Sequence, residues 1–147
     1  MAEIGRRIFG SNLICICVDE VVEGDCKGTI WNQYEEEGRS FENMMDLLQK
    51  MDDLLDELHF PERSNMPREF GKEQKRYNDA PKIPGERVMH ADAFAEKSGA
   101  VATFIARVKF RQKSTWQGEI LWIEQDERVE FASALEMTKL IDKAISQ

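Results

Sequence analysis

Apolar and polar residues alternate along Ala102–Phe110, and a second apolar stretch follows at Trp116–Trp122. Alternation with a period of two is typical of a strand with one buried face. A short third strand is expected before Phe131, and beyond it the apolar residues recur at the three- and four-residue spacing of an amphipathic helix. The last third of the chain therefore predicts a β-β-β-α unit.

The same order of elements is predicted near the N-terminus. Leu13–Val18 and Cys26–Gln33 are expected to be strands, Arg39–Phe41 a short third strand, and Glu42–Leu58 an amphipathic helix that ends before Pro61. A glycine inside the second strand indicates a bulge or a close approach of backbones. Two units with the same element order suggest an internal repeat.

Residues 10–57 align without a gap with residues 100–147 when the numbering is shifted by ninety. The identical pairs are Val18/Val108, Gly28/Gly118, Ile30/Ile120, Glu37/Glu127, Phe41/Phe131 and Asp52/Asp142. Six identities in 48 pairs are few, but the apolar helix positions also coincide, except where Leu48 and Lys50 fall on Thr138 and Leu140. Any two amphipathic helices can be aligned in this way, so the matching turns and strand glycines carry the argument for duplication.

These elements predict an α+β fold of two tandem β-β-β-α repeats in a pseudo-twofold arrangement, within a single domain over 1–147. Repeat one covers 10–58, a connector 59–99, and repeat two 100–147. The repeats could pack their helices on each other's sheets, but we prefer one six-stranded antiparallel sheet with both helices on one face. An ancestor with one repeat would then have been a homodimer. The connector is expected to hold short helices at Arg68–Tyr77 and His90–Lys97, and Gly5–Phe9 is a candidate edge strand.

Composition narrows the class of protein. Of the 147 residues, 41% are hydrophobic and 33% are charged, which favours a soluble globular chain. Its apolar runs fall short of the roughly 18 residues that a membrane span needs, and the N-terminus lacks the pattern of a signal peptide. We expect a cytoplasmic protein that does not bind membranes. The net charge of −8 disfavours non-specific binding to nucleic-acid phosphates.

A basic strand in repeat two is the main candidate for binding. Arg107, Lys109 and Arg111 are spaced by two, so they are expected to share one face, with Phe104, Ala106, Val108 and Phe110 on the other. Basic groups beside aromatic residues on an open sheet suit single-stranded nucleic acid. The candidate binding residues are Arg107, Lys109, Arg111, Lys113, Trp116, Gln117 and Trp122. Alternatively, the basic side chains form ion pairs across the strands with Glu119, Glu124 or Glu130.

Trp31, Trp116 and Trp122 lie in predicted strands, where tryptophan serves either as a half-buried packing residue or as a hot spot for a partner. Cys15 and Cys17 are expected on one face of a strand, and Cys26 on the next strand could approach them. Three thiolates could hold part of a zinc site, although the usual Cys-x-x-Cys spacing is absent. The other interpretation is that all three are buried apolar side chains. The acidic end of the first helix, at Asp52–Glu57, lacks the pattern of a calcium loop.

The sequence contains none of the common catalytic or phosphate-binding motifs. We therefore expect a non-catalytic interaction or regulatory module without a cofactor, which binds a protein partner or itself. Binding of single-stranded nucleic acid through the basic strand and the Trp hairpin is the alternative, and an enzyme or metal protein that uses the cysteines is a third.

Three motifs carry a resemblance to a known group: Phe110-Arg111-Gln112, Thr115-Trp116-Gln117-Gly118, and the helix start Phe131-Ala132-Ser133-Ala134-Leu135-Glu136. The C-terminal third that contains them resembles small proteins of Gram-positive bacteria that pair an FRQxxTWQG hairpin with an F-x-SALE helix. That group offers no function to transfer. In architecture alone, tandem strand-and-helix repeats are similar to the Pur-alpha type of single-strand nucleic-acid binder and to a transcriptional coactivator. Their repeats have four strands and basic sheets, so the likeness concerns the fold only.

Overall fold

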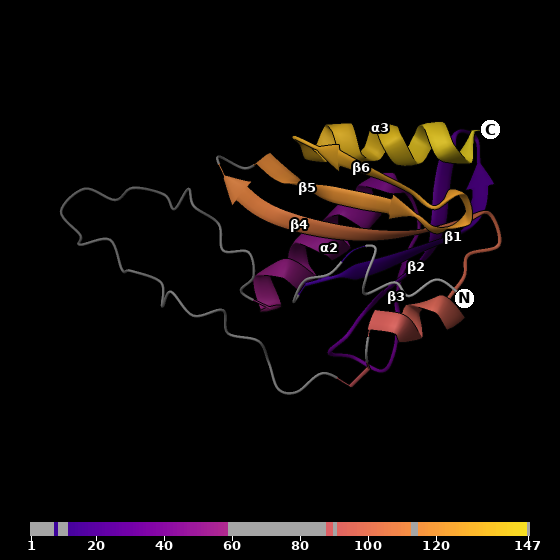
Figure 1. Cartoon of the computed structure of the whole chain (residues 1–147). Coiled ribbons are helices and arrows are strands. Elements are labelled where there is room, and N and C mark those ends of the chain that lie inside the picture. Colours follow the sequence, from indigo (N-terminus) through magenta and orange to yellow (C-terminus); the bar gives the residue numbers. More distant parts are fainter. Residues whose placement is uncertain (1–7, 9–11, 59–87, 90, 113–114, 147) are drawn as a thin grey trace.

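The structure is a computed structural model, and it describes residues 8, 12–58, 88–89, 91–112 and 115–146 (Figure 1). The edge strand expected at Gly5–Phe9 falls almost wholly outside these residues, and so does the helix expected at Arg68–Tyr77.

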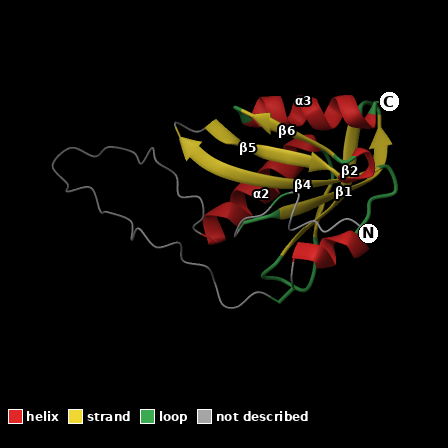
Figure 2. Ribbon diagram, viewed as in Figure 1, coloured by secondary structure: helices red, strands yellow, loops and turns green. Residues whose placement is uncertain are grey.

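Six strands form one antiparallel sheet in the order β3-β2-β1-β4-β5-β6. The strands are β1 (Ile14–Val22), β2 (Asp25–Asn32), β3 (Arg39–Phe41), β4 (Ala102–Gln112), β5 (Thr115–Trp122) and β6 (Glu127–Phe131). β1 and β4 are neighbours at the centre, so the two parts of the chain share one continuous sheet (Figure 2). The α+β class and the joined six-stranded sheet are therefore confirmed.

Two helices, α2 (Met44–Leu58) and α3 (Ala134–Ile145), cover one side of this sheet, here called the helix side. Their apolar residues share one core with inward residues of the central strands, such as Ile16 and Phe104. The opposite side carries the short 3-10 helix η1 (Ala91–Glu96) and is called the η1 side. In Figure 1, α3 lies above the sheet and η1 below it. η1 falls within the segment where the sequence predicts a short helix at His90–Lys97.

The strand pairings of the two halves coincide after the shift of ninety residues. Val18 lies opposite Gly28 as Val108 lies opposite Gly118, and an irregularity follows at once in both hairpins. In the central pair, Ile14 lies opposite Ala106 and Ile16 opposite Phe104, which is again the same pairing shifted by ninety. The interior glycines lie at these close approaches: a Cβ on Gly28 would be 1.8 Å from the Cys17 carbonyl oxygen. The expected close approach is thus confirmed.

Side chains cap both helices at their first turns. The Asn43 Oδ1 accepts a hydrogen bond from the Asp46 N–H at 2.7 Å, and the Ser133 Oγ accepts one from the Glu136 N–H at 3.0 Å. Each satisfies a backbone donor that has no partner within its helix. The caps, together with the strand turns, set where each helix begins above the sheet.

Replacing Ser133 by alanine is expected to lower the free energy of unfolding by about 1 kcal/mol, because this cap is lost. The control is Ser146→Ala at the other end of α3, where the exposed Ser146 Oγ donates to the Asp142 carbonyl at 2.7 Å. We expect that variant to change stability by less than about 0.5 kcal/mol. Urea unfolding of both variants measures the difference, and equal stabilities would show that the Ser133 cap contributes nothing.

Candidate functional site

The expected basic face of β4 is wrong at its last member. An extra residue in β4 places Phe110 opposite Gln117 and Arg111 opposite Trp116. This β-bulge at Lys109 interrupts the two-residue alternation, so every later side chain changes sides. Arg111 therefore lies on the helix side, away from Arg107 and Lys109. Phe110 moves to the η1 side and is 52% exposed, although the sequence predicts it on the apolar face with Phe104.

Arg111 is instead a buried cation held by α2. Its side chain is 3% exposed, and its Nη1 lies 2.8 Å from Asp56 Oδ1 and 3.4 Å from Asp52 Oδ1. Nη2 also donates to the carbonyl of Leu55 at 3.4 Å. These contacts join the end of β4 to the last turns of α2, more than fifty residues earlier in the chain. Two carboxylates at the acidic end of α2 are thus ion-pair partners of Arg111.

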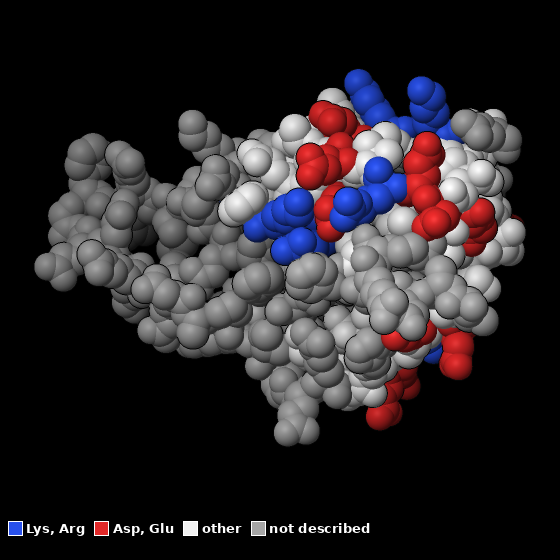
Figure 3. All heavy atoms as spheres, viewed as in Figure 1, with Lys and Arg blue, Asp and Glu red and all other residues white. Residues whose placement is uncertain are grey.

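The remaining basic side chains on β4 form ion pairs across the sheet. Glu119, only 5% exposed, lies between Arg107 at 3.7 Å and Lys109 at 3.5 Å. Lys109 also reaches Glu130 at 3.6 Å, and Arg128 reaches Glu119 at 3.7 Å. The cross-strand alternative is therefore confirmed for Glu119 and Glu130, whereas Glu124 instead accepts the backbone N–H of Thr103 at 2.7 Å. On the face seen in Figure 3, Lys and Arg side chains lie beside Asp and Glu side chains.

The strand tryptophans are mainly packing residues. Trp116 is 7% exposed and belongs to the core on the helix side. Trp122 is half-buried against Phe104, with ring centroids 6.1 Å apart. Gln117 is exposed on the η1 side of β5, and Lys113 lies outside the described residues. The seven candidate binding residues therefore do not form one surface.

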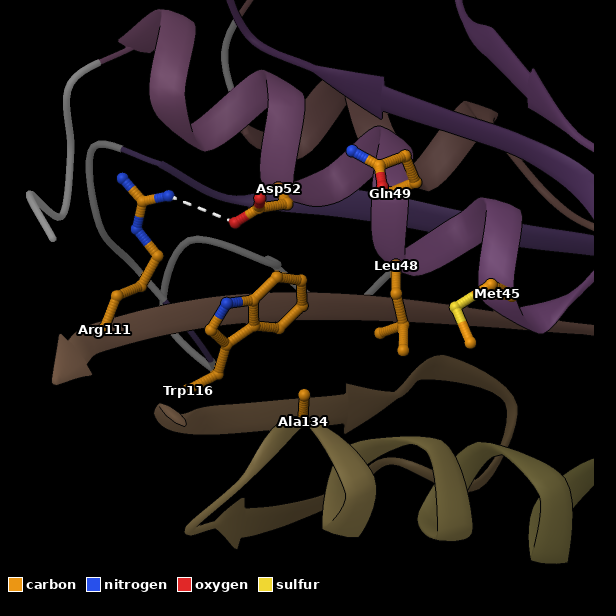
Figure 4. Close-up of a pocket in the computed structure, with 7 residues that line it drawn as sticks. All are labelled: Met45, Leu48, Gln49, Asp52, Arg111, Trp116 and Ala134. Carbon is orange, nitrogen blue, oxygen red and sulfur yellow. Dashed lines mark hydrogen bonds and ion pairs between the residues drawn. The ribbon is translucent and has the colours of Figure 1, made fainter. Parts of the chain in front are cut away.

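A groove between α2 and α3 brings together two of the candidate binding residues, Arg111 and Trp116. It has a volume of about 290 Å³, with its floor at Trp116 and Arg111. Figure 4 shows the Trp116 indole rising from β5, with Leu48 of α2 on one side and Ala134 at the start of α3 on the other. Gln49, Met45 and Asp52 of α2 complete the lining. The groove is thus apolar along most of its length and has the Arg111–Asp52 pair at one end.

Two exposed apolar side chains lie at the helix starts: Met45 in the lining itself and Leu135 beside Ala134. Met45 is 74% exposed and Leu135 is 64% exposed, although both belong to amphipathic helices with a buried stripe. Sequence reasoning missed this groove, because helix spacing alone placed Met45 and Leu135 among the apolar positions of their helices. The available signal was their position in the helix. Each lies two residues before a buried residue, Leu47 or Met137, and residues two apart on a helix lie on different faces.

A second hollow, of about 310 Å³, lies between α3 and the last two strands. Its apolar lining includes Trp122, Val129 and Leu140, and the charged residues in it are Glu127 and Lys143. None of the residues that line it is a fully buried charged group such as Arg111. The groove between the helices therefore has the more specific set of groups.

The three cysteines lie on two sides of the sheet. Cys15 and Cys17 face the η1 side, whereas Cys26 belongs to the core on the helix side, so the sheet separates Cys26 from the other two and a shared site of three thiolates is not formed. Burial raises the pKa of the Cys26 thiol to about 11, which keeps it protonated. A hydrogen bond from Cys15 lowers the pKa of Cys17, and the same contact raises that of Cys15. Among the described residues, no three His, Cys, Asp or Glu side chains are arranged to hold a metal ion.

None of the described helices is long and apolar enough to cross a membrane. Comparison of the chain with protein-family models, with curated proteins and with solved structures finds no match. A function must therefore be argued from the site itself.

Proposed function

We propose that this chain is a non-catalytic binding module whose site is the groove between α2 and α3. The observation that carries the proposal is a hollow lined by Trp116, Leu48 and Ala134 together with the exposed apolar side chain of Met45. Tryptophan and arginine are frequent hot-spot residues, and an apolar groove between helices suits an amphipathic segment of another protein. Filling the groove would remove Met45 from water, which favours binding.

The charge around the groove indicates the kind of segment. Asp52 and Asp56 both contact Arg111, and the same helix also carries the exposed Asp53 and Glu57, of which Glu57 pairs with Arg39. The last turn of α2 contains no basic residue. Opposite charge at the rim of an interface accelerates encounter and helps to select the partner. We therefore propose a partner segment with apolar side chains for the groove and lysine or arginine beside them.

The proposed origin of the site is a duplication of one β-β-β-α unit, arranged about a pseudo-twofold axis. The matching strand registers, the matching irregularities and the paired glycines support this origin. Under the ninety-residue shift Met45 corresponds to Leu135, whereas Trp116 and Arg111 correspond to Cys26 and Val21. The floor of the groove is thus peculiar to the second half, which suits a single bound segment better than a symmetric self-association.

Single-stranded nucleic acid is the second candidate ligand. The basic strand and the Trp hairpin of the second half motivate it, but its support is weaker because Glu119 engages Arg107 and Lys109 and because Arg111 lies on the helix side. Anisotropy titration with a short oligonucleotide at low salt, where phosphate contacts are strongest, separates the two candidates. Binding that is lost in Arg107→Glu/Lys109→Glu would favour nucleic acid over a protein segment.

Selection from a random peptide library, displayed and enriched against the purified chain, tests the groove. We expect enriched peptides that combine apolar and basic residues, and we expect Met45→Glu to weaken them by at least about tenfold. Phe110→Glu is the matched control, since Phe110 is also exposed and apolar but lies on the η1 side. Peptides that bind both variants equally well, or no enrichment at all, would contradict the proposal.

A further inference from the structure

Cys15 and Cys17 form a close thiol pair away from the groove. Both lie on β1 at the centre of the sheet and face the η1 side, and their sulfur atoms are 3.9 Å apart. The pair is buried among apolar residues that include Phe94 of η1, Ile105 of β4 and Leu121 of β5. Two soft sulfur ligands are thus held side by side in a water-poor site.

The strand geometry disfavours a disulfide between them. Residues two apart on a strand have Cα atoms about 6.6 Å apart, at the upper end of the range in which disulfides form. A bond would also require the sulfur atoms to approach from 3.9 Å to about 2.05 Å on a central strand paired on both sides. Bringing the sulfurs so close would distort the central pairing of the sheet.

An ion between the sulfur atoms requires a smaller change than a disulfide does. At a metal–thiolate length of about 2.3 Å, a linear two-coordinate cation would place the sulfurs about 4.6 Å apart, so they would separate by somewhat less than about 1 Å from 3.9 Å. Zinc requires four ligands as a rule, and the described residues offer no third His, Cys, Asp or Glu here. A soft monovalent cation accepts two thiolates and is satisfied without further ligands.

We propose that Cys15 and Cys17 bind one soft monovalent cation of the Cu(I) class as a bis-thiolate. The two thiols release two protons to solvent as two sulfur–metal bonds form, and neither the metal nor the sulfur changes oxidation state. The complex carries one negative charge. Lys97, whose Nζ lies 4.0 Å from the ring centroid of Trp31, is the nearby cation, because Trp31 lies opposite Cys15 in the β1–β2 pair. The charge of Lys97 favours the anionic complex, whereas the carboxylates of Asp19 and Glu124 nearby oppose it.

An anaerobic titration with Cu(I), in competition with a chromophoric Cu(I) chelator, tests the site. The wild-type chain is expected to bind one equivalent, and Cys15→Ala or Cys17→Ala to weaken binding by about 100-fold or more. Cys26→Ala is the matched control, since Cys26 is buried on the other side of the sheet and its variant keeps the wild-type affinity. Alanine keeps the site apolar, and circular dichroism checks that each variant is folded.

X-ray absorption of the Cu(I)-loaded wild type provides a test that does not depend on any variant. We expect two sulfur neighbours and no third ligand. Three sulfur neighbours, a nitrogen or oxygen neighbour, or an affinity unchanged in Cys15→Ala/Cys17→Ala would overturn the proposal. A Zn²⁺ affinity that equals or exceeds that for Cu(I) would overturn it as well.

Discussion

Replacing Gly118 by alanine is expected to destabilise the fold by about 3 kcal/mol or more. The new Cβ would lie 2.0 Å from the Arg107 carbonyl oxygen and 2.9 Å from the Val108 Cα. Both are backbone atoms of the neighbouring strand, so no flexible side chain can move away. β4 and β5 would have to separate at the residue before the bulge, which breaks ladder hydrogen bonds and shifts Arg111 and Trp116 from their positions.

Gly24→Ala is the control for this prediction. Gly24 has a φ of +80°, and a Cβ there would meet no atom within 4 Å, so only backbone strain of about 1 kcal/mol is expected. Gly28→Ala should resemble Gly118→Ala, because its Cβ would lie 1.8 Å from the Cys17 oxygen. Urea unfolding measures all three. A Gly118→Ala variant as stable as Gly24→Ala would mean that the two strands are not in close contact at this residue.

The double variant Asp52→Asn/Asp56→Asn is expected to lose about 2–3 kcal/mol of stability, because Arg111 keeps its charge in a buried position. Breaking a fully buried ion pair costs about 3–5 kcal/mol, and the expected loss is smaller since the Asp56 side chain is 48% exposed. Replacing the cation itself should cost far less. Arg111→Met keeps a long apolar stem against Trp116 and is expected to change stability by less than about 1 kcal/mol.

Asp53→Asn serves as the matched control on the same helix. Asp53 is exposed and accepts a hydrogen bond from Gln49 Nε2 at 3.0 Å, so its replacement removes one acidic charge from α2 without affecting Arg111. We expect a change below about 0.5 kcal/mol. Chemical denaturation gives the three values. An Arg111→Met variant that is less stable than the double asparagine variant would contradict the prediction, because it would show that the buried arginine itself stabilises the fold.

The order of strands and helices could be predicted from the sequence because period-two and helical patterns are local. The ninety-residue match, with a glycine at the same place in each unit, also predicted that the two units share an arrangement of strands. The bulge at Lys109 could not be predicted from the sequence pattern. Apolar and polar residues continue to alternate past Lys109, whereas the alternation of side chains between the two faces of the strand is interrupted there. One inserted residue therefore assigned Arg111 and Phe110 to the wrong sides.

The sequence by itself determined the order of strands and helices, the α+β class of the fold, and an acidic composition with three cysteines. Only the tertiary structure decided which charges meet. Arg111 and Asp56 are 55 residues apart in the chain, and their contact depends on how α2 crosses the end of β4. The groove likewise exists only where α2, α3 and β5 approach one another, and the thiol pair is covered in part by η1, which lies over the central strands. Such sites depend on the relative placement of distant segments, which local periodicity does not specify.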